Sequence, residues 1–574
     1  QDVDQLRRLF EQSALCDQKW LSRPDYQQRT LAYVLGQMTT YYQPVTTLTV
    51  NGSQNGTTPQ ASVDESIPLS DVYNAWRLAA DHGIDLRYCF PWKAWLTWEG
   101  THWHKDDSGE AMRRARNTVK HIIQDGRNWL ERLAAEMEEA SLAQDSNALK
   151  NLKEQQKQAN ALFAHGAQSL ADARLNAMLH QAQSWEGMPV PSETLDADRW
   201  LLNCANGTLP LKIDPQQGAQ MPLLRPHQRE DYLTCCLPVA YDQAAACPVW
   251  DAFLWRIMGG SGAWSYATVT VPELKASDDQ AVELIGFLQR AVGWALTGDT
   301  SEECFFLLHG PGRNGKSKFL GALLDLFGAY GLNTQAETFV EQSRNAGGSG
   351  ATPDVARLRN ARLVTVIESA EGSRLNERLI SQVTGRDRVT ARFLYQESFE
   401  FTPQFKLFYA RNHLPKITSQ NTAMWRRIRH VPFSVTIPEA ERDMHLDEKL
   451  RAELPGILAW AVRGCVAWQR TGLKPPTAVL EATEAYRHEQ DLVQRFLDDA
   501  CHLGPSFETK AGVLFAGFRQ WCQENHERDM SMKEFGKRLD GMGYGIRKSN
   551  GVHRQGIGLD AAYAPGSLKV SNKP

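Results

Sequence analysis

Residues 310–317 place the strongest constraint on the fold, because Gly-Pro-Gly-Arg-Asn-Gly-Lys-Ser fits the pattern G-x-x-x-x-G-K-[ST]. The apolar run before them, residues 304–308, is typical of a buried parallel strand. The apolar residues after them recur on one face of a helix that Gly328 can end. A strand, a glycine-rich loop and a helix in this order predict a loop that holds the phosphates of a nucleotide. The alternative is a chance glycine-rich turn.

Each position of this loop has an expected part in binding ATP and Mg²⁺. Lys316 would reach the β- and γ-phosphates, and Ser317 would ligate Mg²⁺. The glycines would let backbone N–H groups point at the phosphate oxygens. The predicted nucleotide-binding residues are Gly310, Pro311, Gly312, Arg313, Asn314, Gly315, Lys316 and Ser317.

Two downstream apolar runs, residues 363–367 and 406–410, are followed by polar side chains that suit the same site. Glu368 and Glu371 follow the first run, and such carboxylates can hold Mg²⁺ and polarise the attacking water. Glu368 is the better candidate for the metal and Glu371 for the base, although the sequence leaves this division open. The alternative is that both acids face solvent at a strand end. Asn412 follows the second run and would lie between the other two strand ends, where its amide could orient water.

A basic hairpin is predicted between these two strands. Gly385 can end the preceding helix, and residues 389–394 can pair with residues 399–402. Contacts with DNA that ignore base sequence are expected from Arg386, Arg388, Arg392, Tyr395 and Gln396. The alternative is that the arginines pair with Asp387 or Glu397.

Arg426 and Arg427 precede a further apolar stretch, residues 428–433. In ring-shaped ATPases such an arginine enters a neighbour's site and stabilises charge developing on the γ-phosphate. This role requires head-to-tail contacts between subunits. The alternatives are an arginine that acts in its own subunit and one that is paired structurally. Which of the two arginines would act is left open.

Composition limits the remaining possibilities. At 574 residues the chain should hold about three or four domains. The formal net charge of −4 gives no global basic field, so any contact with nucleic acid must be local. No apolar run is long enough for a membrane span, the first thirty residues are charged, and ten scattered cysteines lack a C-x-x-C pair. We therefore expect a cytoplasmic protein with reduced thiols and no membrane partner.

The segments before the loop differ in composition. Residues 51–66 are polar and read as a linker. Aromatic residues then alternate with polar ones at Trp92, Trp95, Trp98 and Trp103. Packing on a small sheet is favoured for them over base stacking at the surface. Residues 110–185 lack proline and are rich in helix formers, so they predict two or three long helices.

The C-terminal residues predict a binding module. Ser531 and Glu534 have the spacing of a capping box, and residues 550–551 are an Asn-Gly turn between basic segments. Two helices and a basic hairpin indicate a winged-helix domain. Its expected contacts with the DNA backbone are Lys533, Lys537, Arg547, Lys548 and Arg554. The alternative is a small packing domain with a solvated face.

The order of these segments resembles the superfamily 3 helicases of phage and plasmid primase-helicases, a branch of the AAA+ ATPases. The resemblance covers roughly residues 70–500 and includes GPGRNGKS, LVTVIESAEG, QVTGRDRVTARFLYQESFEF, KLFYARNHLP and AMWRRIRHVPF. It implies an α/β fold in which helices cover both faces of a parallel sheet. It also implies a ring, most simply a hexamer, that translocates 3′ to 5′ on single-stranded DNA and unwinds forked DNA during replication of a phage, plasmid or related mobile element.

Residues 1–34 resemble the tail of a primase-polymerase module, and the first residue is Gln1 rather than Met, so we expect an N-terminal portion to be missing. No primase carboxylate cluster is visible, so primer synthesis is not assigned to this chain. The expected division is a helical tail over 1–50, a linker over 51–66, an aromatic-rich and helical region over 67–195, a helicase-associated domain over 196–285, the ATPase core over 286–437, a helical lid over 438–500 and the winged-helix domain over 501–574.

Two other classes of function stay open. One is an ATPase switch in an antiviral-defence or nucleic-acid-sensing assembly, which would hydrolyse ATP without unwinding DNA. The other is an origin-binding or scaffold subunit with a vestigial ATPase. The intact Lys316, Ser317, Glu368 and Asn412 count against this last reading.

Overall fold

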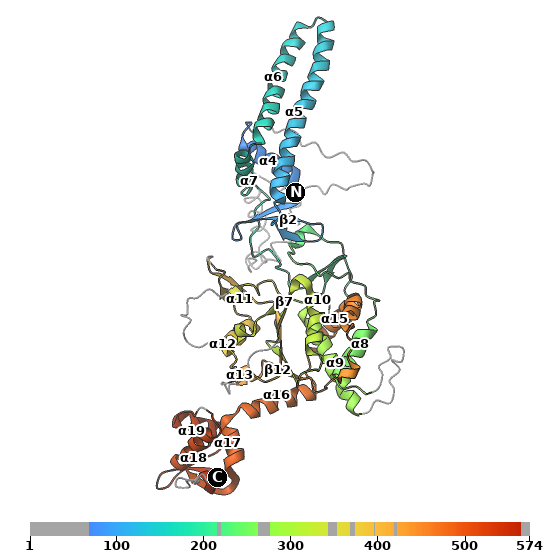
Figure 1. Ribbon diagram of the computed structural model, residues 1–574. Helices are drawn as coiled ribbons and strands as arrows, with labels where there is room; N and C mark the ends of the chain where they lie inside the picture. The colour runs from blue at the N-terminus through green and yellow to red at the C-terminus, as the bar shows by residue number, and fades with distance from the viewer. Residues whose placement is uncertain are drawn as a thin grey trace, which may run out of the picture. The chain divides into compact units, whose positions relative to one another are not determined.

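The computed structural model describes residues 68–214, 220–261, 276–341, 353–367, 373–394, 397–417, 422–527 and 529–563 (Figure 1). The predicted helical tail over 1–50 and the linker over 51–66 lie outside these residues. In the described part of the chain, no helix combines the length and the apolar character needed to cross a membrane. The cysteines of the described ranges are free thiols, as their spacing predicts.

The tryptophan-rich segment forms a small antiparallel sheet of β1 (Leu86–Cys89), β2 (Ala94–Trp98) and β3 (Trp103–Lys105). Trp98 and Trp103 are buried, and their rings meet edge to face. The Trp103 indole Nε1 donates a hydrogen bond to the backbone oxygen of Arg229 at 2.8 Å. The interpretation of these aromatic residues as packed on a sheet is therefore confirmed for the two buried rings.

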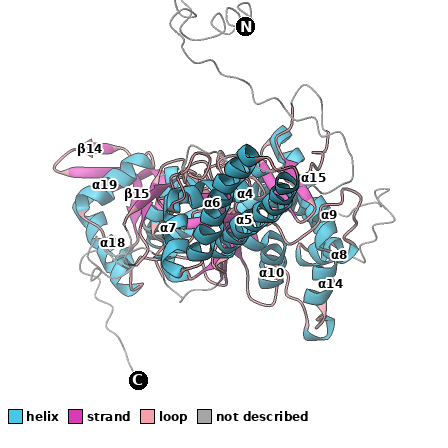
Figure 2. Cartoon of the chain, turned by 90° about the horizontal axis from the view of Figure 1, so that it is seen from above, coloured by secondary structure: helices cyan, strands magenta, loops and turns pink. Residues whose placement is uncertain are grey.

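The predicted long helices are α5 (Glu110–Leu142), α6 (Ser146–Ser169) and α7 (Asp172–Ala182), with α4 (Asp71–His82) packed against α7. Figures 1 and 2 both show α5 and α6 side by side. A Cβ on Gly126 of α5 would lie 2.9 Å from the backbone of Phe163 in α6, so glycine permits the close approach of the two helices.

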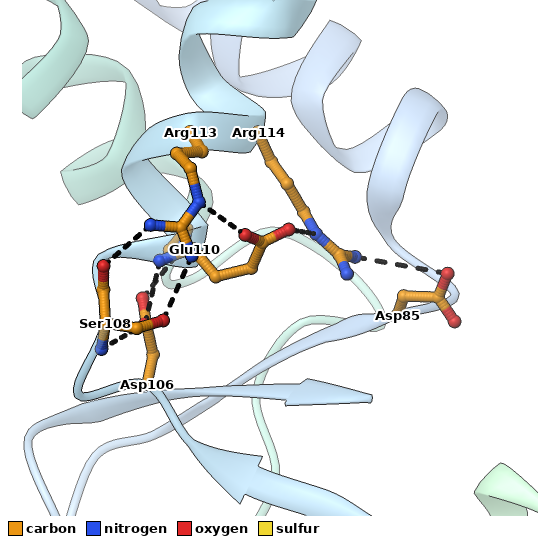
Figure 3. Close-up of polar contacts among 7 residues, drawn as sticks. Asp85, Asp106, Ser108, Glu110, Arg113 and Arg114 are labelled. Carbon is orange, nitrogen blue, oxygen red and sulfur yellow. Dashed lines mark hydrogen bonds and ion pairs between the residues drawn. The ribbon is translucent and has the colours of Figure 1, made fainter. Parts of the chain in front are cut away.

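The first turn of α5 is held by side chains rather than by its N-cap residue, Gly109, which has none (Figure 3). The Asp106 carboxylate accepts hydrogen bonds from the backbone amides of Glu110 at 2.8 Å and Ala111 at 2.9 Å. Glu110 in turn accepts from Arg113 at 2.7 Å and Arg114 at 3.0 Å. Asp106 therefore satisfies amides that a helix start leaves without intrahelical partners.

A five-stranded sheet follows in the chain, with the order β12-β6-β11-β8-β7 and parallel pairing throughout. Its strands are β6 (Phe305–His309), β7 (Gly331–Thr334), β8 (Leu363–Ile367), β11 (Lys406–Arg411) and β12 (Ile428–Pro432). The apolar runs therefore predict the three central strands to within one residue. Because all strands are parallel, their carboxyl ends meet at one edge of the sheet.

Helices cover both faces of this sheet, as predicted (Figure 1). Along β6, Phe306 and Leu308 join one core cluster and Phe305 and Leu307 join the other, because successive side chains of a strand point to opposite faces. The first face carries α8 (Pro248–Ile257), α9 (Ala276–Ala295), α10 (Lys316–Phe327) and α15 (Leu454–Thr471). The second face carries α11 (Pro353–Ala356), α12 (Glu377–Thr384) and α13 (Thr422–Trp425).

Helix α9 runs through residues 285 and 286, between which a domain boundary is expected. Helices α9 and α15 meet backbone to backbone: a Cβ on Gly464 would collide with the carbonyl of Gln289. The hairpin of β4 (Leu201–Cys204) and β5 (Gly207–Pro210) packs into the same core, and α14 (Leu446–Ala452) adds Leu450 to it. The expected helicase-associated, ATPase and lid segments thus share one hydrophobic core.

The C-terminal elements are α17 (Leu492–Ala500), β13 (Cys501–Lys510), α18 (Ala511–Glu524), α19 (Met532–Gly541), β14 (Ile546–Lys548) and β15 (Val552–Leu559). These elements follow the order helix, strand, helix, helix, hairpin, and their strands form the sheet β13-β15-β14; they contain the two helices and the hairpin from which a winged helix is predicted. Ser531 caps α19 by accepting from the Glu534 amide, and Asn550 takes a left-handed φ of 52° in the turn, as predicted. Helix α17, which ends at the boundary expected at residue 500, packs into the core of these C-terminal elements and follows α16 (Thr477–Gln490).

Candidate nucleotide-binding site

The glycine-rich loop joins the carboxyl end of β6 to the first residue of α10, Lys316. Gly312 and Gly315 have φ values of +47° and +84°, in the region that favours glycine. A Cβ on Gly310 would collide with the carbonyl of Phe433. The spacing of the glycines is therefore required by the path of the loop, whose last residue leads directly into the positive end of a helix dipole.

Lys316 lies inside this loop and is 5% exposed. Its ammonium group donates to the backbone oxygen of Gly310 at 2.7 Å, to Asn314 Oδ1 at 3.1 Å and to Asn412 Oδ1 at 3.1 Å. The side chain of Ser317 is exposed on the next position of α10. The loop thus presents a fixed positive charge beside an accessible hydroxyl.

Asn412 follows β11, which lies between β6 and β8 in the sheet. Ala410 of β11 is level with Leu308 of β6 and with Ile367 of β8. The expected position of Asn412 between the two other strand ends is therefore confirmed, and its contact with Lys316 joins the third strand to the loop. Glu368 and Glu371, which follow β8, lie outside the described residues.

Two further residues at this edge, Arg411 and His309, are not among the residues predicted from the sequence to form the site. Arg411 is 1% exposed, and its Nη2 donates to Ser373 Oγ at 2.8 Å. Burial, together with the neighbouring His430 and Lys316, lowers the pKa of His309 to about 4, against a hydrogen bond with the Asn412 backbone that raises it. His309 is consequently a neutral neighbour of Asn412. Both residues could have been found from the sequence, because each is a charged or polar residue at the end of an apolar strand.

Arg426 and Arg427 lie at the opposite edge of the sheet from the loop. Ile428 of β12 is level with Phe305 at the start of β6, whereas Pro432 is level with His309. Four residue steps of about 3.3 Å, or about 13 Å, therefore separate the start of β12 from the level of the loop. Arg426 is 64% exposed and Arg427 is 13% exposed. Both form ion pairs with Glu303, Arg426 at 3.5 Å and Arg427 at 3.6 Å.

The predicted hairpin is present as β9 (Val389–Ala391) and β10 (Phe399–Phe401), which pair antiparallel, and α12 ends at Gly385 as expected. Arg386 and Arg388 are exposed and Arg392 is half-buried. Arg388 Nη1 lies 3.6 Å from a carboxylate oxygen of Glu400. Tyr395 and Gln396, at the turn, lie outside the described residues.

The basic residues of the winged-helix domain divide into two groups. Lys533, Lys537, Arg547 and Lys548 are exposed. Arg554 is 4% exposed and hydrogen-bonds to Asp540 and to the backbone oxygens of Tyr544 at 3.0 Å and Gly536 at 2.9 Å. The guanidinium of Arg554, an expected DNA contact, instead joins β15 to α19.

The described residues include one candidate ligand for a metal ion, Ser317. Among those residues, no group of three or more His, Cys, Asp or Glu side chains could hold a metal ion. The accessible Ser317 hydroxyl beside Lys316 fits the single protein ligand that Mg²⁺ usually takes from such a loop, with nucleotide phosphates and water completing its shell.

Two family models match the chain. Residues 75–259 match the model described as D5 N terminal like, and residues 308–427 match a family of unknown function, DUF5906. The second match begins within β6 and ends at Arg427. It therefore contains the glycine-rich loop, Asn412 and both arginines.

Viral proteins are similar to the same chain. A protein described as "Putative helicase" from Acanthamoeba polyphaga mimivirus is 31% identical over 252 residues, which are 40% of this chain and 26% of that protein. A second protein with this description, from Frog virus 3, is 28% identical over 257 residues, which are 42% of this chain and 26% of that protein. The matched segment spans about a quarter of the length of each relative.

Solved structures of the NrS-1 C-terminal region align more distantly. The apo structure of residues 305–718 covers 68% of this chain and 90% of its own, with 11% identity and a TM-score of 0.36. An A-form apo structure covers 86% and 100%, with 8% identity and a TM-score of 0.41.

The glycine-rich loop between β6 and α10, with Lys316 in contact with Asn412, has the arrangement of a P-loop at the carboxyl edge of a parallel sheet. More specifically, a D5 N-terminal-like region precedes the region that matches DUF5906, and the chain is similar to viral proteins described as putative helicases.

Proposed function

We propose that this chain is the motor of an ATP-dependent DNA helicase that works as a ring of AAA+ subunits in the replication of a phage, plasmid or related mobile element. The observation that carries the proposal is the contact of Lys316 with Asn412 at one edge of the sheet while Arg426 and Arg427 lie at the other. One subunit therefore offers a phosphate-binding half and an arginine half that face different directions.

The residues at the loop suit ATP hydrolysis. Lys316 would exchange its contacts within the loop for the β- and γ-phosphates, and Asn412 would orient the attacking water. Ser317 and Glu368 would hold Mg²⁺, and Glu371 would act as the base. When bound, Mg²⁺ supplies positive charge that neutralises the phosphate oxygens.

The arginine half suits a neighbouring subunit. About 13 Å of sheet separates it from its own loop, which argues against an arginine that acts on the nucleotide of the same subunit. Of the two, Arg426 is the more exposed and is the one we propose to reach the neighbour's γ-phosphate. Head-to-tail contacts of this kind close into a ring, which we propose to be a hexamer.

DNA would meet two basic surfaces. Arg386, Arg388 and Arg392, with Tyr395 and Gln396 at the turn, would follow single-stranded DNA from the hairpin. The exposed winged-helix residues Lys533, Lys537, Arg547 and Lys548 would contact the backbone of forked DNA. Translocation 3′ to 5′ is proposed from the family resemblance.

The decisive experiment measures ATP hydrolysis with and without single-stranded DNA, and strand separation on forked duplexes that offer either a 3′ or a 5′ tail. We expect DNA to stimulate hydrolysis and the 3′-tailed substrate to be unwound. Lys316→Ala should abolish hydrolysis, and so should Arg426→Ala, but mixing the two variants should restore part of it. Hydrolysis that ignores DNA, with no strand separation, would instead favour an ATPase switch.

A further inference from the structure

Glu303 lies on the turn that leads into β6 and contacts both arginines of the opposite edge. Its carboxylate is 3.5 Å from Arg426 Nη2 and 3.6 Å from Arg427 Nη1. Its φ of +46° is in the left-handed region, where a side chain with a Cβ is uncommon. A residue held in this conformation between two guanidinium groups calls for an explanation.

Stability alone is a weak explanation for these ion pairs. Glu303 is 37% exposed and Arg426 is 64% exposed, and pairs at such positions contribute only about 0–1 kcal/mol. Two adjacent guanidinium groups repel each other, so a carboxylate between them fixes where each one points. The ion pairs therefore affect the orientation of the two arginine side chains more than the stability of the fold.

Arg427 extends the contact toward the hairpin. Its Nη1 also donates to the backbone oxygen of Glu303 and to Thr384 Oγ1, both at 3.3 Å. Thr384 is the last residue of α12, where its hydroxyl donates to Ile380 O at 2.6 Å, and the chain enters the hairpin at Gly385. A continuous set of polar contacts thus joins Arg426, Glu303 and Arg427 to the base of the hairpin.

We propose that Glu303 is a positioning residue for the shared ATP site: it holds Arg426 at the exposed edge for the neighbouring subunit, and it holds Arg427 against the base of the hairpin. The inference rests on the proposed function, because it assumes that Arg426 serves a neighbour's nucleotide. When Arg426 moves to a γ-phosphate it leaves Glu303, and Arg427, which shares that carboxylate, shifts against Thr384. The state of a neighbour's nucleotide is in this way passed to the hairpin.

Glu303→Gln tests the first part, because it removes the charge and keeps the size. We expect kcat for ATP hydrolysis to fall about 10- to 100-fold through misplacement of the arginine, while KM is unchanged because the variant's own loop lies at the far edge. Mixing Glu303→Gln with Lys316→Ala should restore hydrolysis, since the variant's intact loop then receives a correctly held arginine. Glu337→Gln, an exposed acid away from the arginines, is the matched control and should behave as the unsubstituted chain.

The outcomes separate this inference from the proposed function. If Arg426→Ala mixed with Lys316→Ala recovers no activity, the shared site itself is overturned. If that mixture recovers activity but Glu303→Gln either keeps its kcat or fails to recover with Lys316→Ala, only the role of Glu303 is overturned. A fold defect in the variant would not be corrected by a neighbour.

Thr384→Val tests the second part, with Thr384→Ser as the conservative control. Loss of the hydroxyl should leave DNA-free hydrolysis in place and reduce its stimulation by single-stranded DNA, and serine should retain the stimulation. Equal stimulation in Thr384→Val and the unsubstituted chain would overturn the link to the hairpin.

Discussion

Lys316 places a buried positive charge at the carboxyl edge of the sheet. Its ammonium group donates to three oxygen atoms, and one of them is the side-chain amide oxygen of Asn412. Its partners come from the loop and from a strand almost a hundred residues further along the chain. A polar side chain at that strand end therefore sets where the ammonium group points. In the proposed function, the same side chain would orient water beside the phosphates.

Asn412→Ala should separate nucleotide binding from hydrolysis. The loop and its backbone amides remain, so the affinity for ATP should change little, whereas kcat should fall about 10²-fold with loss of a preorganised polar group. Equilibrium titration with ATP and steady-state hydrolysis measure the two quantities. Asn525→Ala, at the end of α18, is the control. Equal losses of affinity and kcat would show that Asn412 only supports the loop.

Arg554 and Lys537 should respond differently to alanine although both are basic residues of the winged helix. Arg554→Ala removes the hydrogen bonds from β15 to Gly536 and Asp540 of α19 and should destabilise the domain by about 1–3 kcal/mol. Lys537→Ala should leave stability unchanged, weaken DNA binding and reduce the salt dependence of binding by about one counterion. Thermal unfolding and DNA titration at several salt concentrations distinguish the two. Unchanged DNA binding in Lys537→Ala would point to the alternative of a packing domain.

At the scale of helices and strands, the start of α5 shows how a long helix depends on one side chain outside it (Figure 3). Burial alone would raise the pKa of Asp106, but hydrogen bonds from the backbone amides of Ala111, Glu110, Ser108 and Gly109 outweigh it and hold the pKa below its ordinary value. The ionised carboxylate is thus the form that the folded helix prefers.

Asp106→Ala should cost about 1 kcal/mol of stability at neutral pH, the usual effect of losing a helix cap. Because the folded-state pKa is below the unfolded value, the contribution of Asp106 is present above about pH 4 and is lost as pH falls through the folded pKa. Unfolding of α5, followed by amide hydrogen exchange at pH 7 and pH 3, should therefore show a smaller difference between variant and unsubstituted chain at pH 3. Asp107→Ala, at an exposed neighbouring residue, is the control. A difference independent of pH would contradict the role of the carboxylate.

Elements set by local patterns could be predicted from the sequence, and those set by distant contacts could not. The strands of the ATPase sheet, the hairpin and the capping box at Ser531 follow from spacing within a few residues. Lys406, by contrast, is the first residue of β11 and is 1% exposed. Its burial is possible because the carbonyl of Thr297 accepts a hydrogen bond from its ammonium group, which also lies over the ring of Trp294. Glu303, Arg554 and the course of α9 likewise depend on partners far away in the chain.

At the scale of the whole molecule, the proposed ATP site is divided between the two edges of one sheet and would need a second copy of the chain to be complete. Activity per subunit should therefore depend on assembly, since a lone subunit presents a phosphate-binding half without its arginine.

Specific ATPase activity should fall on dilution and rise again with added protein until assembly is complete. Hydrolysis per subunit, measured across a concentration series alongside mass by light scattering, should follow the fraction of assembled protein. Constant specific activity across a range in which the mass falls to that of one subunit would contradict a shared site. Arg426→Ala should give low activity at every concentration.

The backbone contact between α9 and α15 has a consequence for exchanging parts between related proteins. A chimaera joined between residues 285 and 286 would take the two halves of α9 from different parent proteins. Its α9 would also have to fit against Gly464 of α15, which is more than 150 residues further along the chain. A junction between α16 and α17, where the Asp491 side chain caps α17, cuts no helix and leaves both hydrophobic cores intact. The C-terminal domain could therefore be exchanged as a unit. The five-stranded sheet and its helices would have to be transferred together with the preceding residues, from β4 onward, that share their hydrophobic core.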